Sequence, residues 1–209
     1  MARASFGGSD PLLGTFADAP DSRGLPAWVE RADARRIVAD LSDLEPLARI
    51  LATTDGTVTD ILEAWANDTV AVGHLSQREE SLVRPLPLLD AGARSPVLRR
   101  EVLLVGARSR RPLLYAESLI LVARLPAAIR EGLRHGQTPI GKLLRGYRLE
   151  TYREFLHLGR TSAGPLALPF HAFPDDLMIE RTYRVFAGGR PVMLIHEQFP
   201  QRMTDHRLA

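Results

Sequence analysis

Two charged residues stand on strand faces that are otherwise apolar, and their types suit anion binding and proton transfer. Every second residue of the segment 97–105 is apolar except Arg100, and the same alternation in 192–199 is interrupted by Glu197. The opposite face of the first segment carries Arg99 and Glu101 and is expected to meet water. A charge on a buried face costs several kcal/mol unless it is paired or meets a ligand. Arg100 and Glu197 therefore each need a partner.

Two explanations of this pattern remain open. Arg100 and Glu197 form a structural ion pair, or the strands are more exposed than their pattern indicates. Alternatively, they line a cavity in which Arg100 holds a carboxylate through its planar guanidinium and Glu197 exchanges a proton. In the second case, burial is expected to raise the pKa of Glu197 into the range useful for acid–base catalysis.

A third stretch, Gly136–Leu144, has the composition of a turn that leads into a helix. Gly136 can close a preceding helix in the left-handed conformation, Pro139 suits the first position of a new helix, and Gly141 permits close approach of a ligand or a backbone. Free backbone N–H groups at a helix start favour a carboxylate or a phosphate. A plain connection between two helices is the alternative explanation.

The elements that must position these residues can be read from periodicity. Residues 1–24 are rich in Gly, Pro, Ser and Asp and are expected to form a loose arm, followed by a single domain over 25–209. A capping box at Ser42–Glu45 predicts a helix from Asp43 to Ala52, and Thr57 or Thr59 begins another that ends near Ala66. A further helix is predicted over 126–135.

The rest of the chain is dominated by strand patterns. Segments rich in β-branched, aromatic or leucine residues and bounded by turn residues are 69–75, 97–105, 113–122, 148–158, 178–186 and 192–199. Helices followed by sequential hairpins, with one helical interruption, predict an α+β fold. It consists of an antiparallel sheet of about six strands with helices packed on it.

Composition excludes several kinds of site. The 209 residues are 45% apolar and contain no cysteine, which excludes disulfides, cysteine–zinc sites and iron–sulfur clusters. The six histidines form no closely spaced pair, so no metal site is expected. Lys142 is the only lysine, and no basic run is interleaved with aromatic residues, so no nucleic-acid partner is expected. Neither a membrane span nor a secretion signal is recognisable, which favours a cytoplasmic location.

Several short motifs resemble, in order and spacing, the chorismate pyruvate-lyase family, and its actinobacterial branch in particular. They extend from about residue 51 to 200, and no single motif is specific although the ordered set is. The motifs are Arg100-Glu-Val-Leu-Leu, Ala116, Leu125-Pro126, Thr138-Pro-Ile-Gly141, Arg153-Glu-Phe155, Gly159-Arg160, Gly189-Arg-Pro191 and His196-Glu-Gln-Phe-Pro200.

The resemblance implies a chorismate lyase-like fold with an internal ligand cavity closed by flaps. It implies conversion of chorismate to 4-hydroxybenzoate and pyruvate, and no cofactor is needed because aromatisation drives the reaction. By the resemblance, Arg100 holds the ring carboxylate, the backbone amide of Ile140 contacts the ligand, Glu197 faces the ring hydroxyl, and Val58 is a flap contact. Glu197 and Arg100 are the expected catalytic residues.

The sequence also departs from the better-known members of that family. Ser118 stands where they have arginine, Val58 where they have methionine, and Thr161–Leu177 is longer than their loop. Together with Asp55–Thr59, this long segment is a candidate flap. Three further arginines are candidates to bind the pyruvyl carboxylate: Arg153, Arg160 and Arg181. Arginines of this kind are more often solvated or ion-paired, which is the alternative for each of them.

Other functions must be weighed against lyase activity. The same fold family includes small-molecule sensing domains of transcription regulators, and a structural or interaction protein is a third class. The segment Leu25–Trp65 is too short and too poorly patterned for a winged DNA-binding module, which favours the enzyme. The sequence predicts no oligomeric state.

Overall fold

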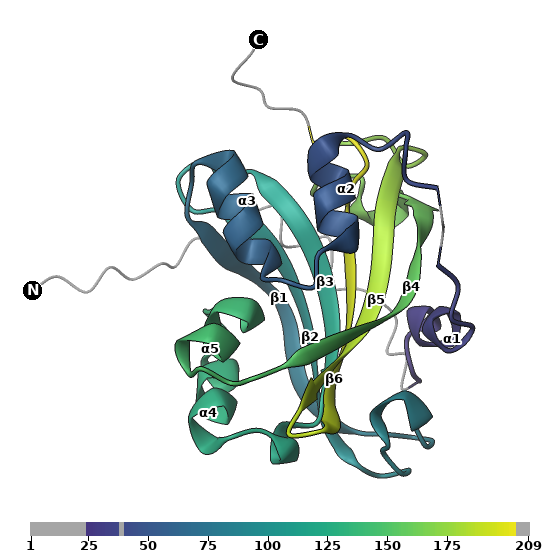
Figure 1. Cartoon of the computed structure of the whole chain (residues 1–209), viewed down its shortest axis with the longest axis vertical. Helices are drawn as coiled ribbons and strands as arrows, with labels where there is room; N and C mark the ends of the chain where they lie inside the picture. The colour runs from purple at the N-terminus through teal and green to yellow at the C-terminus, as the bar shows by residue number, and fades with distance from the viewer. Residues whose placement is uncertain (1–23, 38–39, 204–209) are drawn as a thin grey trace, which may run out of the picture.

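The fold is built around a single antiparallel sheet. The computed structural model describes residues 24–37 and 40–203 (Figure 1). Its strands are β1 Val70–Ser81, β2 Pro96–Gly106, β3 Pro112–Ile120, β4 Tyr152–Ser162, β5 Leu177–Ala187 and β6 Arg190–Pro200. They lie in the order β1-β2-β3-β6-β5-β4, and all neighbouring pairs are antiparallel. The six strands confirm the predicted α+β fold.

Four helices pack on one face of this sheet, which we call the pocket face. They are α2 Pro46–Thr53, α3 Val58–Ala66, α4 Ala127–His135 and α5 Ile140–Gly146 (Figure 1). Leu51 of α2 and Leu62 of α3 are fully buried in a cluster that includes Leu104, whereas Ile129 of α4 packs in a second cluster with Ile195. The apolar alternate residues of the strands thus meet the apolar sides of the helices.

The other face of the sheet, which we call the α1 face, is covered differently. Helix α1, Ala27–Asp33, and the segment 82–91, which contains the short 3-10 helix η2 Pro87–Leu89, pack over Leu119 and Leu194. Residues 163–172, including η4 Gly164–Leu166, pack over Leu103 and Tyr115 on the same face. The prediction that Thr161–Leu177 is a flap over the ligand cavity is therefore wrong, because its apolar residues are used on the far side of the sheet.

The boundaries of several helices differ from the prediction. Helix α2 begins at Pro46 rather than Asp43, since proline lacks an N–H and fits the first helical position, and no side chain caps this helix. The expected capping box at Ser42 is thus not formed. Helix α1 was not predicted because its seven residues are too few for a clear period. None of the helices in the described ranges is long and apolar enough to cross a bilayer.

Three predictions about strands also need correction. β1 continues to Ser81 through a polar run, with a register irregularity after His74, where the prediction ended at residue 75. β4 begins at Tyr152 rather than 148, because α5 occupies the preceding residues and Arg148 has a positive φ of 52°. Arg99, expected to meet water, is only 8% exposed and forms ion pairs with Glu101 and Glu117. The loose arm expected over residues 1–24 lies, except for Gly24, outside the described residues.

Candidate active site

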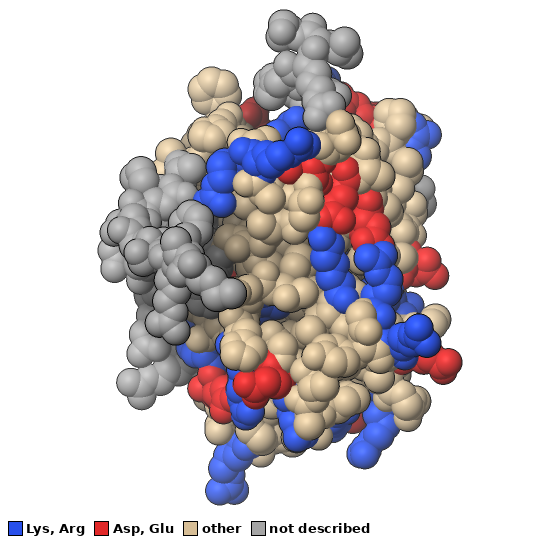
Figure 2. Space-filling model, turned by 90° about the vertical axis from the view of Figure 1, so that its left-hand side faces the viewer, with Lys and Arg blue, Asp and Glu red and all other residues tan. Residues whose placement is uncertain are grey.

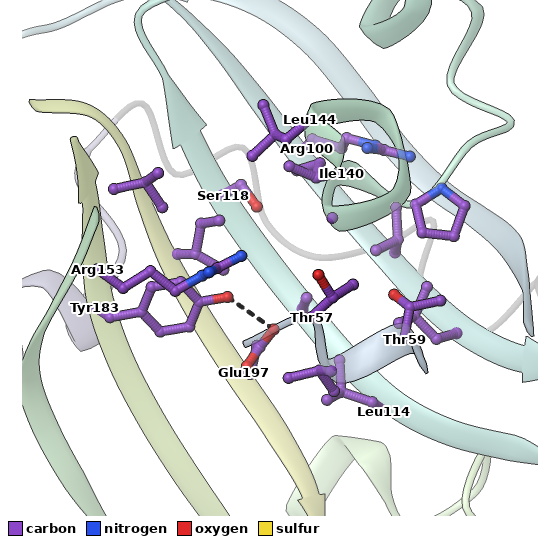
Figure 3. Close-up of a pocket in the computed structure, with 18 of the residues that line it drawn as sticks. Thr57, Thr59, Arg100, Leu114, Ser118, Ile140, Leu144, Arg153, Tyr183 and Glu197 are labelled. Atoms are coloured by element: carbon purple, nitrogen blue, oxygen red, sulfur yellow. Dashed lines mark hydrogen bonds between the residues drawn. The ribbon is translucent and has the colours of Figure 1, made fainter. Parts of the chain in front are cut away.

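A pocket lies between the pocket face of the sheet, the loop that joins α2 to α3, and the start of α5 (Figure 3). The empty space between its lining residues, open solvent at the mouth included, is about 620 Å³. Most of its lining is apolar, which suits a small ligand with a few anchoring groups. The polar side chains that line it are Thr57, Thr59, Arg100, Ser118, Arg153, Tyr183 and Glu197. All four predicted site residues, Val58, Arg100, Ile140 and Glu197, line this pocket.

Arg100 lies at one end of the pocket with part of its guanidinium unpartnered. Its side chain is 1% exposed, and Nη2 donates hydrogen bonds to the carbonyls of Gly136 at 2.9 Å and Thr138 at 3.3 Å. Nε and Nη1 are buried without a hydrogen-bond partner. Burial lowers the pKa of Arg100 to about 10, so the group remains charged at neutral pH. Buried donors of this kind need an acceptor, and the pocket is where a ligand can supply one.

Glu197 lies at the other end and has both carboxylate oxygens engaged. Arg181 Nε donates to Oε2 at 2.6 Å. The Tyr183 hydroxyl donates to Oε1 at 3.0 Å (Figure 3). Arg181 is fully buried and also donates to the carbonyls of Leu51 and Thr54 at the end of α2. The explanation in which Arg100 and Glu197 pair with each other is therefore wrong, because the partner of Glu197 is Arg181.

The register of two strands brings this pair together. Arg181 of β5 and Glu197 of β6 are directly opposite each other in the antiparallel ladder. Burial and the charge of Glu197 raise the pKa of Tyr183, so its hydroxyl stays protonated and donates a hydrogen bond to the carboxylate. The carboxylate is thus held in one orientation by two donors, and its remaining lone pairs face the pocket.

The turn before α5 forms the wall beside Arg100. Gly136 is left-handed, with φ 70°, and ends α4, as predicted. Pro139 occupies the N-cap rather than the first helical position, and Ile140 begins the helix. Because Arg100 binds the carbonyls of Gly136 and Thr138, the guanidinium and the first amides of α5 are held in one place.

The loop between α2 and α3 forms the facing wall. A Cβ placed on Gly141 would lie 2.8 Å from Thr57 Cγ2, so the start of α5 touches the start of α3 through a glycine. Outside this contact, Lys142 pairs with Glu63 and Arg145 pairs with an aspartate of the same helix, α3. Acidic and basic side chains lie next to one another on this side of the molecule (Figure 2).

Two residues that line the pocket, Arg153 and Tyr183, and one that lies behind it, Arg181, were given no definite role from the sequence. Tyr183 was not singled out, and Arg181 and Arg153 were named only as spare cations. A usable signal was present, because alternate residues of β5 are apolar or aromatic except for Arg181, which is the same pattern that identified Arg100 and Glu197. Arg160, the third spare cation, pairs with Asp43 outside the pocket.

The part of the chain that the structure describes contains no evident metal-binding site. No group of three or more His, Asp or Glu side chains is placed there to hold a metal ion. The polar groups of the pocket are instead two arginines, one carboxylate and several hydroxyls, which suit an organic anion that carries a hydroxyl group.

Comparison with known proteins identifies relatives over most of the chain. The family model described as "Chorismate pyruvate-lyase Rv2949c-like" matches residues 52–207. A chorismate pyruvate-lyase from Mycobacterium leprae is 32% identical over 173 residues, which are 82% of this chain and 79% of the relative. The enzyme of the same name from Mycobacterium tuberculosis is 33% identical over 155 residues, covering 72% of this chain and 78% of the relative.

Solved structures show the same fold at low sequence identity. PhnF from Mycobacterium smegmatis matches with a TM-score of 0.57 at 14% identity, over 73% of this chain and 67% of that protein. The separate effector domain of PhnF gives the same TM-score over 72% of this chain and 93% of the domain. At this level of identity the match speaks for the arrangement of strands and helices alone.

Proposed function

Because the chain belongs to the Rv2949c-like chorismate pyruvate-lyase family, we propose that it converts chorismate to 4-hydroxybenzoate and pyruvate in the pocket between the sheet and α5. The observation that carries the proposal is Arg100, whose buried Nε and Nη1 lack partners in a pocket that has a fixed carboxylate, Glu197, at its other end. A ring with a carboxylate at one end and a hydroxyl at the other matches both groups.

The reaction requires positioning more than bond activation. In chorismate the enolpyruvyl ether is attached next to the ring carbon that carries the hydroxyl. The C–O bond to the ring breaks, that neighbouring carbon loses its proton, and the ring becomes aromatic, while enolpyruvate takes up a proton on its methylene carbon to give pyruvate. Aromatisation drives the reaction, so the protein has to hold the dianion in one pose, accept or guide a proton, and exclude water.

Each predicted residue has a task in this scheme. Arg100 binds the ring carboxylate by charge-assisted hydrogen bonds, and the amide of Ile140 at the start of α5 donates to the same group. Val58, 6% exposed, packs against the ring from the α2–α3 loop. These contacts fix the end of the ring that does not react.

Glu197 acts at the reacting end. Because Arg181 and Tyr183 both donate to it, Glu197 is an acceptor. It can accept the hydrogen bond of the ring hydroxyl, or the proton of the ring carbon that bears this hydroxyl. From the sequence, we expected Glu197 to be a protonated acid whose pKa is raised by burial. The buried arginine opposite it is a reason to assign it the acceptor's role instead.

A direct assay tests the proposal against its alternatives. Purified protein is mixed with chorismate in the presence of EDTA, and 4-hydroxybenzoate absorbance and pyruvate are followed together. Equal rates of formation of the two products are expected. Tight binding of 4-hydroxybenzoate without turnover would point to a sensing domain, and neither binding nor turnover would leave a structural role. Strong inhibition by 4-hydroxybenzoate is also expected, because the product keeps the carboxylate and hydroxyl of its substrate.

A further inference from the structure

Arg153 is a second pocket cation to which the scheme above gives no task. It lies near the start of β4, is half-buried and lines the pocket. Its Nη1 donates to the carbonyl of Asp55 in the α2–α3 loop. Among the described residues no carboxylate lies within ion-pair distance of it, whereas Arg160 on the same strand pairs with Asp43. Arg184 of the adjacent strand pairs likewise with Glu154.

The position of Arg153 separates it from Arg100. Its side chain crosses Tyr183 and extends into the pocket near Glu197, while Arg100 lies at the far end beside Ile140 (Figure 3). The charge of Arg153 is close enough to act on the Tyr183 hydroxyl, whose pKa it lowers against the larger effect of burial. Arg153 therefore faces the reacting end of a ligand anchored on Arg100.

The charges of the pocket do not balance without a ligand. The charged side chains that line it are Arg100, Arg153 and Glu197. Glu197 is already neutralised by Arg181, which lies behind it and is fully buried. Two positive charges are left, one at each end of the pocket. A ligand with two carboxylates would neutralise both, and a ligand with one would neutralise a single end.

We propose that Arg153 binds the carboxylate of the enolpyruvyl group, the part of chorismate that leaves as pyruvate. This rests on the proposed function, since chorismate has two carboxylates and 4-hydroxybenzoate keeps only the one assigned to Arg100. Arg153 is then a residue that distinguishes substrate from product. Its hydrogen bond to Asp55 also places the α2–α3 loop over the leaving group, so the same guanidinium closes that loop and binds the carboxylate.

The experiment compares Arg153→Met with Arg160→Met, which removes an arginine from the same strand outside the pocket. Methionine keeps an unbranched stem and removes the charge. For Arg153→Met we expect kcat/KM for chorismate to fall about 10- to 150-fold, the range of one charge-assisted hydrogen bond. The inhibition constant of 4-hydroxybenzoate should change less than about threefold, because that ligand lacks the second carboxylate. Arg160→Met should behave as wild type in both measurements.

The outcomes separate this proposal from the proposed function. Equal weakening of chorismate and 4-hydroxybenzoate, or no change in either, would overturn the role of Arg153 while wild-type turnover still stands. If the wild type does not turn chorismate over, calorimetry with chorismate and with 4-hydroxybenzoate replaces the kinetic assay. Selective loss of chorismate affinity in Arg153→Met would support a site for a dianion. Absence of chorismate binding to the wild type would overturn both proposals. Arg153→Lys keeps the positive charge, so its kcat/KM for chorismate should lie between those of the wild type and Arg153→Met. This variant also tests the proposal if Arg153→Met folds poorly.

Discussion

Both faces of the sheet bury charged side chains with some unpartnered nitrogens, among them Arg99 on the α1 face and Arg100 on the pocket face. The difference is that Arg99 forms ion pairs with Glu101 and Glu117, whereas Arg100 has no ion-pair partner among the described residues and lines a pocket. On the α1 face, Glu180 is 4% exposed and accepts hydrogen bonds from Arg31 at 2.9 Å and from His157 at 3.0 Å. On the pocket face, Arg100 is 1% exposed and has two nitrogens without a partner. The comparison teaches that burial of a charge does not by itself indicate a functional site. Whether the charge is balanced within the protein, and whether its side chain lines a pocket, is more informative.

Neighbouring residues of β6 belong to the two different settings. His196 faces α1, where it stacks on Trp28 with ring centroids 5.2 Å apart and shares a hydrogen bond of 2.9 Å with Thr182. Glu197 faces the pocket, where Arg181 and Tyr183 leave it free to accept a further hydrogen bond. The alternation of one strand thus places a structural histidine and a candidate catalytic glutamate side by side.

The largest effect is expected from Glu180→Gln on the α1 face. The amide keeps the shape but removes the charge that balances Arg31, and breaking a buried ion pair costs about 3 kcal/mol or more of unfolding free energy. Arg31 is partly exposed, which places the expected loss at the lower end. Urea unfolding measures the loss, and turnover of chorismate by the folded variant should stay near wild type. A large fall in kcat would mean that the two faces are not separate.

The matched change on the pocket face is Glu197→Gln. If Glu197 takes a proton from the ring, turnover should fall about 100-fold while 4-hydroxybenzoate still binds. If it only orients the ring hydroxyl, the loss should be about tenfold, the value of one hydrogen bond. Near-native turnover would exclude proton transfer by Glu197 and favour transfer within bound chorismate. An unfolded variant would assign Glu197, like Glu180, to the stability of a buried cation.

Arg100→Ala tests the other end of the pocket. Affinity for 4-hydroxybenzoate should fall by about 2 to 3 kcal/mol, because the carboxylate loses a charge-assisted partner. Calorimetry with the folded variant measures this. Arg99→Ala is the control on the opposite face: it removes ion pairs with Glu101 and Glu117 and should lower stability without changing the affinity for the product. Unchanged product affinity in Arg100→Ala would remove Arg100 from the site.

The smallest effect is a pH dependence that belongs to the α1 face. Burial lowers the pKa of His196 to about 3, against the attraction of Glu180 and aided by Arg31 and His157. Between pH 6.5 and 3 the unfolded chain takes up a proton there and the folded chain does not, so stability falls as the pH is lowered. The free energy of unfolding should be about 2 kcal/mol lower at pH 5 than at pH 7 because of this group.

Glu180 adds a second loss at lower pH. Although burial raises its pKa, the hydrogen bond with His157 and the charge of Arg31 lower it overall, so its contribution disappears as the pH falls below 4.5 toward the folded value. Urea unfolding at several pH values, for wild type and His196→Gln, separates the two groups. The variant should lose the slope between pH 7 and 5, and parallel curves would contradict the assignment.

Sequence alternation was enough to place Arg100 and Glu197 on the face that carries the pocket. The strands around them are long and strongly apolar, and a shift of one residue would have exposed every apolar side chain. Their roles toward chorismate remain predictions. The partner of Glu197 was not predictable in the same way, because pairing with Arg181 depends on the β5–β6 register, which shifts between Val185 and Phe186.

Local patterns failed where tertiary packing decided the outcome. The predicted capping box at Ser42 is not formed, because helix α2 begins at Pro46, whose fixed φ suits the first helical position. The segment 163–172 has enough apolar residues to be a lid, but the order of the strands places its cluster against Leu103 and Tyr115, away from the pocket. Arg99 was expected to be solvent-exposed because the elements that pack on its face of the sheet, such as the seven-residue helix α1, are too short to be recognised from periodicity.

Gly141 allows two walls of the pocket to touch. With no side chain there, the first turn of α5 rests on Thr57, and the ion pairs of Lys142 and Arg145 hold the same two walls together from outside. Any larger residue would act as a wedge that keeps the walls apart. Under the proposed function, we expect the residence time of the aromatic product to depend on how readily this contact between α5 and Thr57 opens. The rate at which that contact opens, rather than the strength of any single anchor, would then limit how often the pocket is refilled.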